Sequence, residues 1–179
     1  MLSISHSSLF RLHSAASITT LLKASKKSEH LKQMQACVIH HALEQDHFLV
    51  SLFISCAHTL LSTFSYAFSI FYHVLALPTF LWNTLVKSHC QKNLFSHTLS
   101  VFARMKAHGE LPYSFTYPFV IKAYSGACKV REGKLLHGFA FLCSIDHDLY
   151  KGTILINMYR KCRDIADACK VFHGMSVGM

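Results

Sequence analysis

The chain is poor in the residues that make tight turns and in acidic residues. Among its 179 residues are 7 glycines and 3 prolines, which argues against an all-β fold because such a fold needs many tight turns. Nine Asp and Glu residues stand against 18 Lys and Arg residues, a formal net charge of +9. This balance favours an anionic partner, either nucleic acid or an acidic membrane surface. The length suits one ordinary domain or a short array of repeats.

The seven cysteines include no C-x-x-C pair. Their odd number and apolar neighbours indicate reduced thiols buried in helices, without a disulfide framework. A zinc deaminase needs H-x-E together with P-C-x-x-C, and only the first part is matched, by His108-Gly109-Glu110. No Cys/His cluster has the spacing of metal ligands, and neither a nucleophile motif nor a phosphate loop is present. We therefore expect no enzyme, no cofactor, no metal and no small-molecule substrate.

A long stretch also lacks charge. Between Asp46 and Lys87 there is no Asp, Glu, Lys or Arg, and the run 59–77 is long enough to cross a membrane. His58, His73 and several hydroxyl side chains interrupt it, and the same apolar positions recur elsewhere with charges between them. We therefore expect no membrane span.

The N-terminal segment 1–28 contains no acidic residue and many Ser and Thr, a composition that fits an organelle transit peptide. We assign residues 1–13 to it. Arg11 within the amphipathic pattern SLFRLHSAA favours the mitochondrion, with the chloroplast as the alternative.

Hydrophobic spacing repeats along the chain. The stretch FLWNTLVK (80–87) returns 35 residues later as FTYPFVIK (115–122) and again as YKGTILIN (150–157). An upstream copy, at a slightly shorter offset, reads FLVSLFIS (48–55). Four copies at a near-constant offset indicate an array of repeats.

A second apolar signature follows each copy. SVFARM (100–105) and KVFHGM (170–175) are separated by twice that offset, and SIFYHV (69–74) and LLHGFA (135–140) hold the equivalent places. Each unit is therefore an apolar segment, a short polar break and a second apolar segment.

Both segments have helical spacing. Apolar positions recur at i, i+3, i+4 and i+7, which places them on one helical face. The two clearest sets are Thr98, Val101, Phe102 and Met105, and Ala168, Val171, Phe172 and Met175. The expected N-caps of the first helices are Asp46, Thr79, Ser114 and Asp148. Pro118 lies in the first turns of its helix, where a missing N–H costs little. The sequence thus predicts an all-α fold, an α-solenoid of stacked helix-turn-helix units.

A polar stripe runs along the first helices at recurring positions, each pair four residues apart and so on one side of its helix. The pairs are Ser51/Ser55, Asn83/Lys87, Pro118/Lys122 and Thr153/Asn157. One such stripe alone is an ordinary solvated face. Its recurrence in a basic chain favours a binding face.

These residues resemble a known family. A 35-residue hairpin with WNTLVK (82–87) in one helix, VFARM (101–105) in the next and GELP (109–112) after them resembles a pentatricopeptide repeat. The alternation of unit lengths resembles the plant P-L-S class, and REGKLLHG (131–138) and ILINMYRKCRDIADACKVFHGM (154–175) are similar to its L and S units.

On this resemblance the repeat array spans 14–179. Its units are L-like 14–46, S 47–78, P 79–113, L 114–148 and S 149–179. The chain stops at SVGM, where another unit would begin, so we expect a short or truncated member of the class with an exposed apolar end face.

The resemblance implies binding of single-stranded organellar RNA, about one base per unit. The fifth and last residues of a unit would choose the base and the second would pack against it. The fifth residues are Ser51, Asn83, Pro118 and Thr153, and the second residues are Phe48, Phe80, Phe115 and Tyr150. Among the last residues only Asp148 follows the family pattern. Lys87 and Lys122 would attract phosphates. For the aromatic residues, packing between repeats is the alternative.

We therefore expect a non-catalytic RNA-binding repeat protein of plant organelle RNA metabolism. It would assist RNA editing, another RNA modification or processing by recruiting an enzyme in trans. The alternatives are a helical-repeat scaffold for protein interactions and a truncated paralogue with no independent function.

Overall fold

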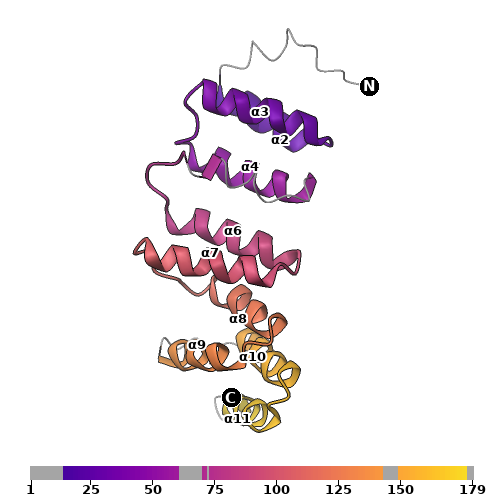
Figure 1. Cartoon of the computed structure of the whole chain (residues 1–179), viewed down its shortest axis with the longest axis vertical. Helices are drawn as coiled ribbons and strands as arrows, with labels where there is room; N and C mark the ends of the chain where they lie inside the picture. The colour runs from indigo at the N-terminus through magenta and orange to yellow at the C-terminus, as the bar shows by residue number, and fades with distance from the viewer. Residues whose placement is uncertain (1–13, 61–69, 72, 143–148, 177–179) are drawn as a thin grey trace. The chain divides into compact units, whose positions relative to one another are not determined.

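The computed structural model describes residues 14–60, 70–71, 73–142 and 149–176. Within these ranges it contains nine helices and no strand (Figure 1). The helices are α2 (Ala15–Ala24), α3 (Ser28–His40), α4 (His47–Leu60), α6 (Thr79–Gln91), α7 (Phe95–Ala107), α8 (Tyr117–Gly126), α9 (Val130–Leu142), α10 (Leu149–Lys161) and α11 (Ile165–Ser176). The predicted all-α class of paired helices is confirmed. The transit peptide assigned to 1–13 lies outside the described residues.

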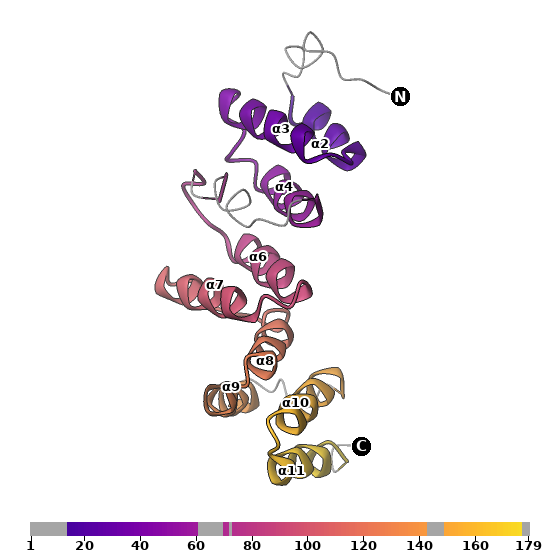
Figure 2. The same cartoon turned by 45° about the vertical axis from the view of Figure 1, so that its right-hand side comes forward.

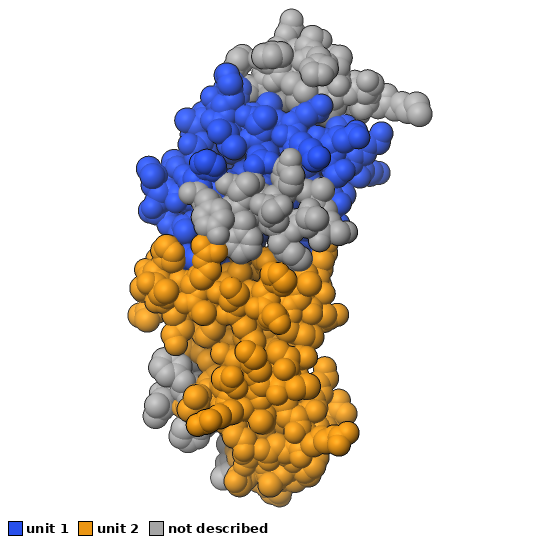
Figure 3. Space-filling view, viewed as in Figure 1, with its two compact units in different colours: residues 1–84 blue, residues 85–179 orange. Residues whose placement is uncertain are grey.

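The chain forms two compact units, residues 1–84 and 85–179 (Figure 3). The boundary falls within α6.

Unit 1 packs α2, α3 and α4 against one another and adds the first residues of α6. The carboxylate of Asp46 accepts a hydrogen bond of 3.0 Å from the N–H of Leu49, so the predicted cap of α4 is confirmed. Trp82 is fully buried, and the ring of Phe71 meets it edge-on with centroids 4.8 Å apart. Burial of this largest side chain is a main hydrophobic contribution to the unit.

In unit 2, α8 packs against α7 and α10, and α9 covers α8 and α10 (Figures 1 and 2). α11 packs on α10. The central core of these helices consists of Tyr117, Ile121, Leu155, Met158, Tyr159 and Ala168. The face predicted for 98–105 is buried throughout. In α11, Phe172 holds the equivalent position but is 59% exposed.

Turns repeat along the chain with the same backbone geometry. Five of the described residues have a left-handed φ: Ala42, Asn93, Gly109, Cys128 and Arg163. In each case the next N–H donates to the carbonyl five residues before it, at 2.9 to 3.1 Å, which is the hydrogen bond of a Schellman motif. Asn93, Cys128 and Arg163, each at the end of a first helix, follow one another at the repeat offset seen in the sequence. The predicted period is therefore present in the backbone.

Three local predictions need correction. α8 begins at Tyr117 and its cap position is Thr116, so Ser114 is not a cap. Thr79 is the first residue of α6 and not its cap. Among the described cysteines the predicted burial holds for Cys90 alone, whereas Cys37, Cys56 and Cys162 are half-buried and Cys128 and Cys169 are exposed. Cys128 and Cys162 follow the ends of α8 and α10 and so lie outside helices. Asp148 and Cys143 lie outside the described residues.

Two further expectations can be compared with the helices. Pro118 stands in the first turn of α8, as predicted. No helix in the described part of the chain is long and apolar enough to cross a membrane; residues 61–69 and 72 of the apolar run 59–77 lie outside that part.

Close packing of α7 on α8 depends on Gly126. A Cβ added at Gly126 would overlap the ring of half-buried Phe95, so this ring would have to leave its present position. We expect Gly126→Ala to lower the free energy of unfolding by about 1–3 kcal/mol through overpacking. Gly138→Ala is the matched control, because nothing lies within 4 Å of its added Cβ and alanine favours the helix by up to about 1 kcal/mol. Urea unfolding followed by circular dichroism measures both, and equal midpoints would contradict this role of Gly126.

Candidate nucleic-acid interface

A concavity of about 310 Å³ in unit 2 is lined by residues of three first helices. Its lining comes from the last residues of α6 and from α8 and α10. The residues are Cys90, Gln91, Pro118, Phe119, Lys122, Ser125, Ile154, Asn157 and Lys161. The packing of α8 on α10 brings residues of both polar stripes into the lining of this concavity.

The charge of this concavity is positive. Lys122 and Lys161 are exposed on its walls, and none of the described residues that line it is acidic. The Cys90 thiol at its base donates to the carbonyl of Phe119 at 3.3 Å. Burial raises the pKa of this thiol, and the Lys122 ammonium partly opposes the rise. Cys90 is therefore a packing group, whereas the two lysines and the amides of Gln91 and Asn157 can meet an anionic, hydrogen-bonding ligand.

Only part of the predicted stripe lies in this concavity. It contains Pro118, Lys122 and Asn157. Pro118 is buried and has no side-chain donor or acceptor, so it can offer a base only an apolar contact. Lys87 and Thr153 are exposed and do not line the concavity.

In unit 1, the predicted base-contacting residues Ser51 and Asn83 are half-buried. The Ser51 hydroxyl lies 3.3 Å from that of Thr84, a contact that links α4 to α6. Ser51 therefore contributes to helix packing as well as to the surface.

The aromatic residues predicted to stack on bases are exposed. Phe48 is 64% exposed, Phe80 39% and Phe115 73%, so part of each ring is accessible to a ligand. Phe115 contacts the ring of Tyr113 edge-on, with centroids 6.1 Å apart. Tyr150 lies in α10, but its side chain is outside the described residues, as is Asp148.

Sequence reasoning missed Gln91, Ser125 and Lys161 in the concavity. The sequence contains a signal for two of them, Gln91 and Lys161. Gln91 follows Lys87 by four residues, and Lys161 follows Asn157 by four, so each continues a stripe by one helical turn. Extending each pair to a triplet would have found both.

A larger concavity of about 550 Å³ lies among α7, the 109–112 segment, α8 and α9. Its walls are mostly apolar, and they include the exposed side chains of Leu111 (79%) and Leu135 (74%). Lys106, Glu110 and Glu132 carry charges of both signs around it. This concavity is a poorer match for a polyanion than the basic one.

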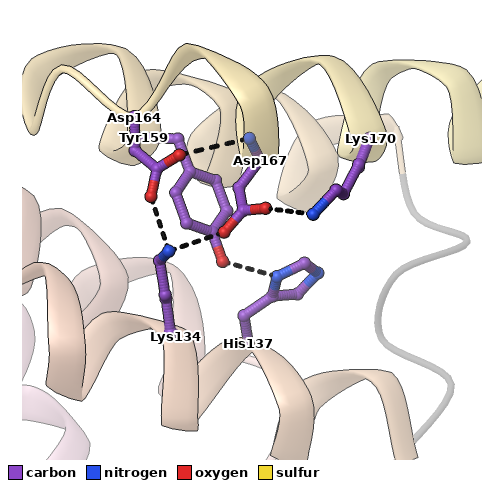
Figure 4. A network of polar contacts seen from close by, with 6 residues as sticks. All are labelled: Lys134, His137, Tyr159, Asp164, Asp167 and Lys170. Carbon is purple, nitrogen blue, oxygen red and sulfur yellow. Dashed lines mark hydrogen bonds and ion pairs between the residues drawn. The ribbon is translucent and has the colours of Figure 1, made fainter.

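A polar network joins α9 to the α10–α11 turn (Figure 4). The ammonium of Lys134 lies 2.6 Å from a carboxylate oxygen of Asp164 and 2.7 Å from one of Asp167. Hydrogen bonds from Lys134 and Lys170 lower the pKa of Asp167 to about 2. Nδ1 of His137 lies 2.8 Å from the Tyr159 hydroxyl. The network holds neighbouring hairpins in register and lies outside both concavities.

Tyr159 makes stability depend on pH in the alkaline range. Burial raises its pKa to about 12, whereas an unfolded tyrosine titrates near about 10. Its contribution is fully present below about pH 10 and is lost as the pH rises towards 12, because only the unfolded state then releases the proton. We expect Tyr159→Phe to unfold more easily at neutral pH by about 0.5–1.5 kcal/mol and to lose less stability between pH 10 and 12. Urea midpoints across this pH range measure the stability of both proteins. An equal loss of stability in the two would contradict this role of Tyr159.

Fold and concavity together define a helical-repeat protein with a basic surface on its first helices. The family model described as PPR repeat matches residues 80–110 and 153–177. A pentatricopeptide repeat-containing protein of Arabidopsis thaliana, At5g37570, is 39% identical over 173 residues, which cover 96% of this chain and 30% of that protein. A second, At3g08820, is 32% identical over 87% of this chain and 22% of its own length. The chain belongs to the pentatricopeptide repeat family.

The chain spans less than a third of the length of these curated relatives. Another relative, At1g08070, has a name that ends in "chloroplastic"; it is 35% identical over 60% of this chain and 14% of its own length.

Proposed function

We propose that this chain binds single-stranded RNA in a plant organelle, without catalysis of its own, through the surface of its first helices. The observation that supports this most directly is the concavity with Lys122 and Lys161 on its walls and no acidic residue among its described lining. The pentatricopeptide repeat family acts by binding RNA.

The chemistry of the surface suits a single strand. Lysines neutralise phosphates in any sequence, and amides such as that of Asn157 can hydrogen-bond base edges that pairing would hide. Exposed Phe48, Phe80 and Phe115 offer faces for unpaired bases. Ser51, Asn83 and Thr153 are the proposed base-contacting residues, with Lys87 in support.

The finer assignments belong to this proposal. We propose that the chain is a member of the P-L-S class with the unit boundaries predicted from the sequence. It would recruit an enzyme for RNA editing or processing in trans, and residues 1–13 would form a transit peptide. The mitochondrion is the proposed location. The chloroplast is the alternative, in line with the printed name of one relative.

Fluorescence anisotropy with a labelled single-stranded RNA tests the proposal. We expect binding at low salt. The logarithm of the binding constant should fall linearly with the logarithm of the salt concentration, with a slope of about −0.7 for each phosphate contacted. A duplex of the same sequence should bind more weakly because its bases are paired. Single-stranded binding no stronger than that of a helical-repeat protein of neutral charge would refute the proposal.

The larger concavity favours a second candidate function, a scaffold for protein interactions. Exposed Leu111 and Leu135 beside an apolar hollow are features of protein-binding surfaces. A pull-down from organelle extract that survives nuclease treatment and is lost in Leu111→Ser/Leu135→Ser would support it. If nuclease treatment abolishes the capture, RNA and not a direct protein contact mediates the interaction.

A further inference from the structure

Two thiols stand at the ends of neighbouring first helices in unit 2. Cys128 lies in the turn after α8, and Cys162 directly follows the last residue of α10. Both are free, with Cys128 exposed and Cys162 half-buried. They come from consecutive repeats, so they are separated in the chain by nearly one repeat length.

Contacts on two sides bring these turns together. On one side, Ser125 near the end of α8 and Lys161 at the end of α10 line the same concavity. On the other side, Lys134 in α9 forms an ion pair with Asp164, two residues beyond Cys162. The two thiols lie on chain segments between these contacts. They are near enough for a negative charge on Cys128 to raise the pKa of Cys162, in addition to the larger effect of burial.

We infer that Cys128 and Cys162 form a redox modification site, in which a reversible disulfide bridges the first-helix ends of two consecutive repeats. A disulfide requires Cα atoms within about 7 Å. Both residues lie at the ends of helices, where the turns can adjust more easily than helix interiors can.

The reaction needs a low-molecular-weight disulfide such as oxidised glutathione. The thiolate of exposed Cys128 attacks one glutathione sulfur, which forms a mixed disulfide and releases one glutathione thiolate. The thiolate of Cys162 then attacks the Cys128 sulfur of the mixed disulfide and releases the second glutathione. The protein loses two protons and two electrons, and oxidised glutathione gains them as two reduced glutathione molecules.

The bridge would close a loop that contains all of α9 and α10. Such a loop restricts the unfolded chain and so raises stability. It would also hold Lys161, which directly precedes Cys162, at a set distance from α8. The inference does not depend on RNA binding.

Mass spectrometry of the full chain tests the site. The reduced protein is incubated with oxidised glutathione, remaining thiols are alkylated, and tryptic peptides are mapped without reduction. We expect a loss of about 2 Da from one intramolecular disulfide and a cross-link between the Cys128 and Cys162 peptides. Cys128→Ser and Cys162→Ser should each abolish the cross-link. The control Cys169→Ser should retain it, because this equally exposed cysteine is not part of the pair.

A second measurement distinguishes a specific disulfide between Cys128 and Cys162 from incidental oxidation of exposed thiols. The oxidised protein should have a higher urea midpoint than the reduced protein, and Cys162→Ser should show no such difference. A cross-link between other cysteines, or glutathione retained on Cys128 without a bridge, would overturn the inference. Failure here would leave the RNA proposal untouched, since that has its own binding assay.

Discussion

Trp82→Ala is expected to lower the free energy of unfolding by about 3–5 kcal/mol, the range for removing a large aromatic side chain from a core. Trp82 has no exposed surface. Its indole meets the ring of Phe71 edge-on, so truncation removes both the buried area and a favourable aromatic contact. Because native domains are stable by only about 5–15 kcal/mol, unit 1 is expected to be largely destabilised.

Phe48→Ala is the matched control for this change. Phe48 belongs to the same unit but is 64% exposed, so its loss should change stability by no more than about 0.5 kcal/mol. Far-ultraviolet circular dichroism during urea unfolding is the suitable signal, because Trp82 is the chain's one tryptophan and its removal abolishes indole fluorescence. Equal midpoints for the two variants would show that the core of unit 1 does not depend on Trp82.

Reversing both lysine charges of the basic concavity is expected to weaken single-stranded RNA binding at low salt by about tenfold or more. The variant is Lys122→Glu/Lys161→Glu. If each lysine neutralises one phosphate, the salt slope should also fall by about 1.4, because each contact to a single strand contributes about 0.7. Both side chains are exposed, so stability should change little. Anisotropy titrations across a salt series measure both quantities.

Lys106→Glu/Arg131→Glu is the charge-matched control. It changes the net charge by the same amount, but Lys106 and Arg131 lie on the second helices α7 and α9, away from the basic concavity. We expect its affinity to fall much less. Equal losses in the two double variants would show that the net charge of +9 alone governs binding, without a defined surface.

Much of the fold could be predicted because helical repeats are governed by local rules. Apolar spacing placed Val101, Phe102 and Met105 on a buried face, and the restricted φ of Pro118 suits the first turn of α8. The constant offset between copies corresponds to the recurrence of left-handed turn residues at Asn93, Cys128 and Arg163. Each of these features depends on a few neighbouring residues, and the sequence alone therefore carries it.

The composition of the candidate site required the tertiary structure. Periodicity states which side of its own helix a residue occupies, but not how far neighbouring hairpins are offset or how closely they pack. That packing brought Lys161 and Lys122 into the lining of one concavity. It also buried Pro118, although Pro118 holds the same repeat position as exposed Thr153. It left Phe172 exposed where Phe102 is buried, and it brought the ends of α8 and α10, just before Cys128 and Cys162, to one concavity. Contacts between elements decide these outcomes, because burial and pairing depend on what lies opposite a residue.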